Sequence, residues 1–361
     1  MKSKKSLSAC CLLAAMAMAV CSATAADKAD QNPKHQIHKP DSKPVDMTKP
    51  VKVFIMMGQS NMFGMGVISP EEKNGTLEYV TKKDKKFPYL LDDSGKWTVR
   101  NDVRYVQVMT GKGAGAMQTQ HNEWLTVTGK TIGPEIAFGH IMGQVIDEPV
   151  LLLKACIGNR SLGWDLLPPG SARYEVGDKI YAGYKDSPDS WAKGTEPKPI
   201  NWYAGKQYDD DTALAKKVLG ELDKYYPGAK QYEVAGFVWW QGHKDQNAVH
   251  AARYEQNLVN LIKSLRKDFN VPKAPFVLAV GCGNPGRTSF GLQIAEAQLA
   301  MNDAKKHPEF AGNVMCVESR DFLKDASVSP TGAGYHYNGN AETYMEVGNA
   351  LGWAMADLLK K

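Results

Sequence analysis

Five short apolar runs, separated by stretches of helical periodicity, constrain the fold of this chain more than any other feature of its sequence. Runs without polar alternation are typical of strands that are buried on both faces of a parallel sheet. They occupy residues 51–57, 150–155, 235–240, 276–280 and 314–317, and the helical stretches occupy 134–145, 213–225, 248–267, 291–303 and 341–359. This alternation predicts an α/β fold with helices on both faces of a central parallel sheet. A mixed α+β fold would require several of these assignments to be wrong.

Two long segments interrupt the alternation of strands and helices. Residues 67–130 and 165–209 are rich in Gly, Pro, Lys and aromatic residues and show little periodicity. Long unpatterned segments in a compact enzyme are typical of lids and binding loops. We therefore expect one domain over residues 51–361 that carries two insertions.

The first 50 residues predict export. Lysines near the start precede an apolar run over residues 7–20, which is too short to span a membrane, and small residues follow it. This order predicts a signal peptide over residues 1–25. Lipid attachment at Cys21 is less favoured, because Val20 is a poor small-residue neighbour. Residues 26–50 are polar and contain four prolines, which predicts a flexible leader on a secreted or periplasmic protein.

Charge and cysteine content argue against several classes of function. The formal net charge is only +5 and the lysines are scattered, so we predict no binding to nucleic acid. No later stretch is long and apolar enough to cross a bilayer. After export the chain keeps Cys156, Cys282 and Cys316, each in or beside an apolar run, where we expect small core hydrophobes. No Cys/His cluster has metal-ligand spacing, so we predict no metal and no other cofactor.

A distinctive polar sequence, Gly58-Gln59-Ser60-Asn61-Met62, follows the first apolar run. Parallel sheets bind ligands at the carboxyl ends of their strands. The glycine allows a tight turn, and the following helical turn directs N–H groups at the serine, which suits an activated hydroxyl beside an oxyanion site. The alternative is a serine that caps the next helix, and Gly-x-Ser alone would favour it.

Three further segments place reactive groups at other strand ends. Gly158 follows the second apolar run and can bring its N–H close to a reacting carbonyl. Gln241 follows the third run and carries a side-chain amide that can face the same oxyanion. His336 precedes the last helix and supplies a base. A nucleophile, two oxyanion donors and a base thus occur in an order that one fold can use.

These four blocks resemble the SGNH hydrolases, in the form found in sialate O-acetylesterase-like proteins and family-six carbohydrate esterases. Gly58 to Met62 resembles the first block, Gly158 the second, Trp240-Gln241-Gly242 the third, and His336 the last. The resemblance covers residues 51–359. It implies a flavodoxin-like three-layer α/β/α sandwich that hydrolyses esters, usually acetyl groups on sugars.

Two departures from the family pattern concern the acid that usually orients the catalytic histidine. The family commonly has Asp three residues before that histidine, where this chain has Ala333, and many relatives have Glu after Gln-Gly, where it has His243. Asp245 is our first candidate for the acid, followed by Asp325 and Glu342. A serine–histidine dyad stays open, because a backbone carbonyl can also fix a histidine tautomer. His243 is equally compatible with a structural role.

The predicted mechanism is acyl transfer to Ser60 with His336 as base. The oxyanion would be held by the Ser60 and Gly158 amides and the Gln241 side chain. Predicted substrate-binding residues are Gln59, Asn61, Asn159, Arg160 and His243. For Asn159 and Arg160 the alternative is that they tie down their own loop.

An acetylated carbohydrate is the predicted substrate, because aromatic rings in the second insertion can stack on sugars. The rings are Trp164, Tyr174, Tyr181, Tyr184, Trp191, Trp202 and Tyr203. For any one of them, packing within the insertion is at least as good an explanation. The alternatives are a lipase-like or aryl esterase on the same fold, a decayed carbohydrate-binding protein, and a structural surface protein. The sequence leaves the glycan and the oligomeric state open.

Overall fold

A seven-stranded sheet forms the centre of the protein. The computed structural model describes residues 35–41, 43, 45–111, 116–281 and 289–360, and the account that follows concerns the unit from Ile37 onward. The strand order is β12-β11-β10-β1-β6-β3-β4, and every neighbouring pair is parallel except β3 with β4. The strands are β1 (Val51–Gly58), β3 (Arg100–Thr110), β4 (Met117–Leu125), β6 (Val150–Ala155), β10 (Tyr232–Trp240), β11 (Phe276–Val280) and β12 (Val314–Glu318).

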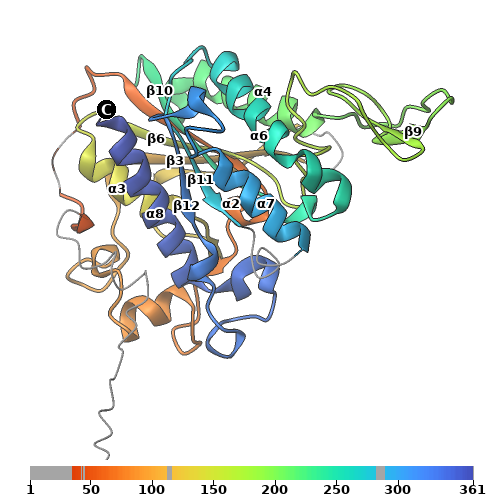
Figure 1. Ribbon diagram of the computed structural model, residues 1–361. Helices are drawn as coiled ribbons and strands as arrows, with labels where there is room; N and C mark the ends of the chain where they lie inside the picture. Colours follow the sequence, from red (N-terminus) through yellow and green to blue (C-terminus); the bar gives the residue numbers. More distant parts are fainter. Residues whose placement is uncertain (1–34, 42, 44, 112–115, 282–288, 361) are drawn as a thin grey trace, which may run out of the picture. The chain divides into compact units, whose positions relative to one another are not determined.

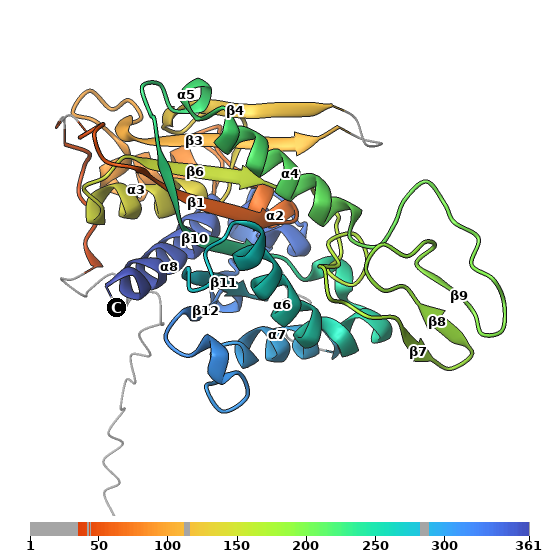
Figure 2. The ribbon, with the colours of Figure 1, turned by 90° about the horizontal axis from the view of Figure 1, so that it is seen from above.

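Helices cover both faces of this sheet (Figures 1 and 2). One face carries α3 (Glu135–Val145) and α8 (Ala341–Leu359), which pack side by side. The other face carries α4 (Lys206–Gly220), α6 (Ala248–Asp268) and α7 (Ser289–Ala300). The prediction of a three-layer α/β/α sandwich is confirmed, and the last helix begins and ends at the predicted residues.

Short elements complete the fold. Two-stranded and three-stranded sheets are formed by β2 (Gly66–Val67) with β5 (Thr131–Ile132), and by β7 (Tyr174–Val176), β8 (Lys179–Tyr181) and β9 (Ser190–Ala192). Short helices are α2 (Ser60–Phe63) and α5 (Leu222–Tyr225), and a π-helix spans Tyr79–Lys83. Single 3₁₀ turns lie at Pro88–Leu90, His243–Asp245, Pro308–Phe310, Arg320–Phe322 and Ala326–Val328, and Gly334–Gly339 holds two 3₁₀ turns separated by a kink. No helix in the described part of the chain is long and apolar enough to cross a membrane.

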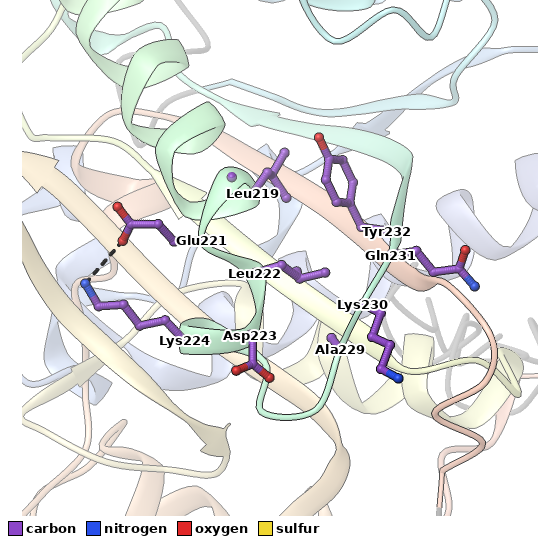
Figure 3. Close-up of a pocket in the computed structure, with 10 residues that line it drawn as sticks. Leu219, Glu221, Leu222, Asp223, Lys224, Ala229, Lys230, Gln231 and Tyr232 are labelled. Carbon is purple, nitrogen blue, oxygen red and sulfur yellow. Dashed lines mark hydrogen bonds and ion pairs between the residues drawn. The ribbon is translucent and has the colours of Figure 1, made fainter.

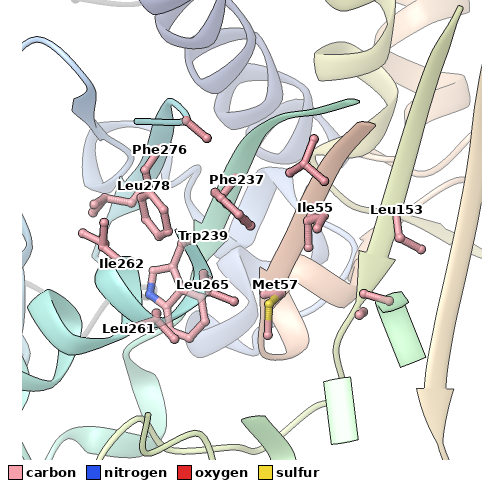
Figure 4. Packing of buried hydrophobic residues seen from close by; sticks show 14 of the residues in the cluster. Ile55, Met57, Leu153, Phe237, Trp239, Leu261, Ile262, Leu265, Phe276 and Leu278 are labelled. Carbon is pink, nitrogen blue, oxygen red and sulfur yellow. The ribbon is translucent and has the colours of Figure 1, made fainter. Parts of the chain in front are cut away.

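Alternate residues of each central strand enter two separate cores, as the pleat of a strand requires. Ile55 and Met57 of β1 pack with Trp239 and the α6 side chains Leu261 and Leu265, as Figure 4 shows. The intervening residues of β1 pack on the opposite face against α3 and α8. Because the central strands are covered on both faces, their sequences are continuously apolar, and this is why they were predictable.

The first predicted insertion is partly regular structure. Residues 67–130 contain β3 and β4, which extend the sheet at its edge. Their sequences hide this, because β3 buries Arg104 and Gln107 among its apolar residues, and β4 is a largely polar edge strand. The prediction of one long unpatterned insertion is therefore corrected to an irregular stretch over 67–99 followed by two strands.

The second insertion forms an arm that carries β7, β8 and β9 and extends away from the central sheet (Figure 2). Its base is closed by hydrogen bonds from Gly205 N to Trp164 O and from Gln207 N to Asp165 O. Its own small core contains Leu167, along with Ala182, Ala204 and the partly buried Trp164 and Trp191. The arm thus has packing of its own.

The two cysteines in the described part of the chain are unpaired and pack as the sequence predicts. Cys156 belongs to one core, and Cys316 packs against the other. Burial raises the pKa of Cys156 far above its usual range and that of Cys316 to about 12, so both thiols stay protonated at neutral pH. The predicted cleavage site, Cys21 and Cys282 lie outside the described residues.

A buried ion pair joins the sheet to the turn behind Ser60. Lys154 of β6 is fully buried, and its Nζ lies 2.5 Å from Glu135 Oε2 at the start of α3. The same Nζ donates to Phe63 O at the end of α2, and Glu135 Oε1 accepts from Gly133 N. The pair therefore fixes α2 and α3 relative to the central strands.

Replacing Lys154 by Met should lower the free energy of unfolding by about 3–5 kcal/mol, because Glu135 then remains buried without its partner. The double change Lys154→Met with Glu135→Leu should recover most of that loss. Urea unfolding measures both. Lys217→Met, in the exposed Lys217–Glu221 pair, is the control and should have little effect. A Lys154→Met variant as stable as this control would contradict the expectation.

Candidate active site

Three of the predicted segments meet because they follow neighbouring parallel strands. β1 lies between β6 and β10, and Gly58 at its end is paired with Trp240 at the end of β10. The two backbones approach so closely that a Cβ on Gly58 would lie 2.2 Å from Trp240 O, and the φ of Gly58 is +152°. Only glycine fits this position. The close approach sets Ser60 beside the segment that contains Gln241.

The structure brings Ser60 and His336 together. Ser60 is the first residue of α2, and its Oγ lies 2.9 Å from His336 Nε2, although 276 positions separate the two residues. Ser60 is buried, with 7% of its surface exposed, and His336 is partly buried. Nε2 is the acceptor when the neutral imidazole carries its proton on Nδ1, so this contact can move a proton from the hydroxyl to the ring.

The backbone after His336 adopts a costly conformation. Tyr337 and Asn338 both have positive φ, +50° and +57°, which is rare for residues other than glycine. Packing stabilises them, because the buried Tyr337 ring lies against Trp240 and Asn338 Nδ2 donates to Lys324 O. The two strained residues therefore directly follow His336 and hold its segment in a sharp bend.

Two backbone amides are available at the nucleophile. Gly158 approaches Ser60 so closely that a Cβ on it would lie 3.5 Å from Ser60 Cβ. Within the described ranges no protein acceptor takes the N–H of Ser60 or of Gly158. Asn159 follows with a φ of +59°, which turns the chain sharply after Gly158. These two N–H groups are the structural candidates for oxyanion donors.

Gln241 has other partners than the predicted oxyanion. Its side chain is 1% exposed, and its Nε2 lies 2.6 Å from Asp245 Oδ2, 2.9 Å from Arg160 O and 3.2 Å from Gln59 Oε1. Its Oε1 accepts from Tyr254 OH. Because two amide hydrogens already have three acceptors, we correct its assignment from oxyanion donor to a bridge between the strand-end loops.

Asp245 does not contact His336. It is fully buried, and its oxygens accept from Leu162 N at 2.8 Å, Gly163 N at 2.7 Å and the Gln241 side chain. Its assignment as acid partner is therefore corrected, because its hydrogen bonds fix the loop that follows Gly158 instead.

The other two acid candidates are also engaged elsewhere. Asp325 is exposed and caps a turn through Ser327, and Glu342 pairs with Lys86 and Lys324. Among the residues that the structure describes, no carboxylate lies within hydrogen-bond distance of the His336 ring. The geometry here is that of a serine–histidine dyad.

The prediction that Gln59 and Asn61 bind substrate is also corrected. They are 2% and 1% exposed and bonded inside the protein, so neither is placed to contact a substrate. Gln59 Oε1 accepts from the Gln241 amide, whereas Asn61 Nδ2 donates to Tyr335 O and its Oδ1 accepts from Tyr344 OH. The sequence did not reveal Tyr344, because a tyrosine in the first turn of an amphipathic helix looks like an ordinary core residue.

The side chains of Arg160 and His243 are partly exposed. The Arg160 guanidinium lies 5.1 Å from the centre of the Trp202 ring and donates through Nε to Gln207 Oε1 at 3.0 Å. The His243 ring stacks on Tyr335 with 5.4 Å between ring centres. Both side chains are partly exposed, as substrate contacts require.

Most aromatic rings of the arm have protein partners on their faces. Tyr174 stacks on Tyr181 and lies beneath Arg253, and Trp191 lies beneath Arg173. This arrangement favours the alternative that the rings pack the insertion. Trp202 is distinct, because its ring is covered by Arg160, which belongs to the loop that follows Gly158. Lys206 also lies over the Trp202 ring.

A pocket of about 720 Å³ lies at the opposite end of the sheet (Figure 3). It is lined by α5 and by residues from Ala229 to Tyr232 at the start of β10, whereas Ser60 lies beyond the other ends of these strands. It contains none of the candidate catalytic residues. Within the described residues, no group of three His, Cys, Asp or Glu side chains is arranged to hold a metal ion.

Family comparisons agree with the motifs. The family model described as carbohydrate esterase, sialic acid-specific acetylesterase, matches residues 50–357. This match spans most of the chain, and the protein belongs to that family. The resemblance to sialate O-acetylesterase-like SGNH proteins is confirmed, and membership supports an esterase that removes acetyl groups from carbohydrate.

Individual relatives are distant. A probable carbohydrate esterase of Arabidopsis thaliana is 23% identical over 286 residues, which cover 75% of this chain and 80% of that protein. A solved structure of an Arabidopsis thaliana protein aligns with a TM-score of 0.49 and 17% identity over 85% of this chain and 98% of that one. A carbohydrate acetylesterase from Xanthomonas citri aligns with a TM-score of 0.49 and 14% identity over 84% and 55% of the two chains.

His336 should titrate below pH 6.5, the ordinary pKa of its imidazole. Burial lowers the pKa of His336, and the nearby His243 lowers it further. The ring therefore stays neutral and able to accept a proton to a more acidic pH than a free imidazole does. Histidine NMR shifts recorded against pH test this. His243→Asn should raise the pKa of His336 while leaving it below 6.5, since burial is the larger cause, and a midpoint above 6.5 in the unmodified protein would refute the expectation.

Proposed function

We propose that this protein is a secreted serine esterase that removes acetyl groups from acetylated carbohydrates through an acyl-enzyme on Ser60. The observation that carries the proposal is the 2.9 Å contact between Ser60 Oγ and His336 Nε2, beside two backbone N–H groups without protein acceptors. Family membership supports the ester class. The charged, apolar and small-residue order of the first 25 residues supports export.

The reaction starts when His336 Nε2 takes the proton of Ser60, whose Oγ attacks the ester carbonyl. The N–H groups of Ser60 and Gly158 stabilise the developing oxyanion. His336 then gives its proton to the departing sugar oxygen, which leaves an acetyl group on Ser60. A water molecule, deprotonated by the same ring, releases acetate and restores the hydroxyl.

Arg160 is the substrate-binding residue that the geometry supports best. Its Nε is used by Gln207, and its terminal nitrogens have no acceptor among the described residues. Trp202 lies under the guanidinium, so its plane is held at a fixed orientation. A guanidinium held this way can donate two parallel hydrogen bonds to the hydroxyls or a carboxylate of a sugar.

Ser60→Ala should reduce acetate release by at least about a thousandfold, because no other group then accepts the acetyl. Acetate release is measured on a panel of acetylated polysaccharides, and an organophosphonate that labels reactive serines should modify the unmodified protein and not the variant. Cys156→Ser, a buried change outside the proposed mechanism, is the control for folding and should keep activity. Full esterase activity in the purified Ser60→Ala protein would overturn the proposal.

The same panel separates the alternatives. A lipase-like or aryl esterase would prefer long acyl or aryl model esters over acetyl sugars in a chain-length series. A decayed carbohydrate-binding protein would bind sugars without turnover, and the phosphonate would leave Ser60 unlabelled. The neutral, hydrogen-bonded imidazole at Ser60 favours the enzyme.

Arg160→Met should raise KM by about tenfold or more with a smaller effect on kcat, since a hydrogen bond to a charged group contributes about 1.5–3 kcal/mol. Initial rates on the preferred acetylated sugar measure both constants. Arg173→Met is the matched control, because Arg173 also stacks on a tryptophan but already pairs with Asp186. An equal rise in KM for the two variants would show that Arg160 has no special contact with the substrate.

A further inference from the structure

The segment that contains His336 is held by hydrogen bonds to its backbone. Tyr344 OH lies 2.7 Å from Asn61 Oδ1 and 3.2 Å from His336 O, so its single proton is shared between two acceptors. Asn61 Nδ2 in turn donates to Tyr335 O at 3.2 Å. One amide and one hydroxyl thus connect the residue after the nucleophile to both carbonyls that flank the base.

Asn61 and Tyr344 form a hydrogen-bonded bridge to the segment of His336, and both side chains are shielded from solvent and closely packed. Tyr344 is fully buried and Asn61 is 1% exposed. The Tyr344 ring packs against Trp240 at 5.4 Å and Tyr337 at 6.3 Å between ring centres. Hydrogen bonds in such surroundings are strong and poorly exchanged with water, and a polar group left without a partner there is costly.

In a conventional triad a carboxylate fixes the orientation and tautomer of the histidine ring and stabilises its charged form. Here the described residues place no carboxylate at that ring, yet Nε2 still lies at hydrogen-bond distance from Ser60. The bend at Tyr337 and Asn338 is strained, so the segment needs an external restraint to keep its position. Packing on Trp240 and the hydrogen bond to Lys324 O hold the bend itself, and the bridge of Asn61 and Tyr344 is the restraint that acts on the carbonyls of Tyr335 and His336.

We propose that Tyr344 and Asn61 are positioning residues that hold His336 against Ser60, a task otherwise performed by the carboxylate of a triad. This inference rests on the proposed serine esterase function. The bridge acts on the backbone of His336. It can therefore replace the carboxylate in orienting the ring, but not in stabilising the charged form of the ring. It should therefore affect kcat, because the substrate touches neither buried group.

Tyr344→Phe removes the hydroxyl and keeps the aromatic packing. We expect kcat to fall about fivefold with KM unchanged, since the lost hydrogen bond raises the barrier by about 1 kcal/mol. The second-order rate of phosphonate labelling at Ser60 should fall by a similar factor. Tyr208→Phe is the matched control, because Tyr208 is 1% exposed on the opposite face of the sheet and loses a hydrogen bond to Asp268. It should lower the melting temperature comparably and leave kcat unchanged.

A double-mutant cycle tests whether the two residues act as one unit. Asn61→Ala should lower kcat like Tyr344→Phe, and the double variant should lose about as much as the worse single variant. Asn61→Ala leaves the tyrosine in the core, so it carries the same expectation if Tyr344→Phe fails to fold. Losses that multiply in the double variant would mean that the two residues act separately and would overturn the bridge.

The failure of this inference is distinguishable from failure of the proposed function. An inactive Ser60→Ala protein together with unchanged kcat and labelling in Tyr344→Phe would overturn only the bridge. Activity that survives Ser60→Ala would overturn the function on which the bridge rests.

Discussion

The close contact between the ends of β1 and β10 is the constraint on which the rest of the site depends. Gly58 permits it, because any side chain there would meet Trp240 O. Gln59 N then donates to the same carbonyl at 3.2 Å, and the Gln59 side chain reaches Gln241. The turn that carries Ser60 beyond the end of β1 is thereby fixed to the neighbouring strand β10.

Asp245, the acidic residue nearest to the expected motif, is bonded to the loop that follows Gly158 and not to His336. A fully buried carboxylate is costly unless hydrogen bonds satisfy it, and Asp245 receives them from Leu162 N, Gly163 N and the Gln241 amide. These bonds hold the loop that begins at Gly158. The loop after Gly158 is thus fixed through a buried carboxyl group, and the segment of His336 through the side chains of Asn61 and Tyr344.

The sequence predicts elements whose environment is simple and fails where long-range pairing decides the structure. Central strands buried on both faces appear as apolar runs, and amphipathic helices such as α8 show their period, so both were predictable. β3 and β4 were not, because buried polar residues such as Arg104 interrupt the pattern and find partners far away in the chain. For the same reason the motifs predicted the pair Ser60 and His336, which the structure brings within 2.9 Å, but misassigned Gln241 and Asp245, whose contacts depend on which partners the folded loops bring near.

The base of the arm contacts the loop that follows Gly158, through Trp202 and Arg160. Farther out, Trp191 is covered by Arg173 of the arm and Tyr174 by Arg253 of α6. Trp202, at the base of the arm, is covered by Arg160. Behind Arg160, Gln207 donates to Asp211, and burial raises the pKa of Asp211 far above its usual range. The guanidinium of Arg160 is thus packed on Trp202 and bonded to Gln207, and Gln207 is held in turn by Asp211.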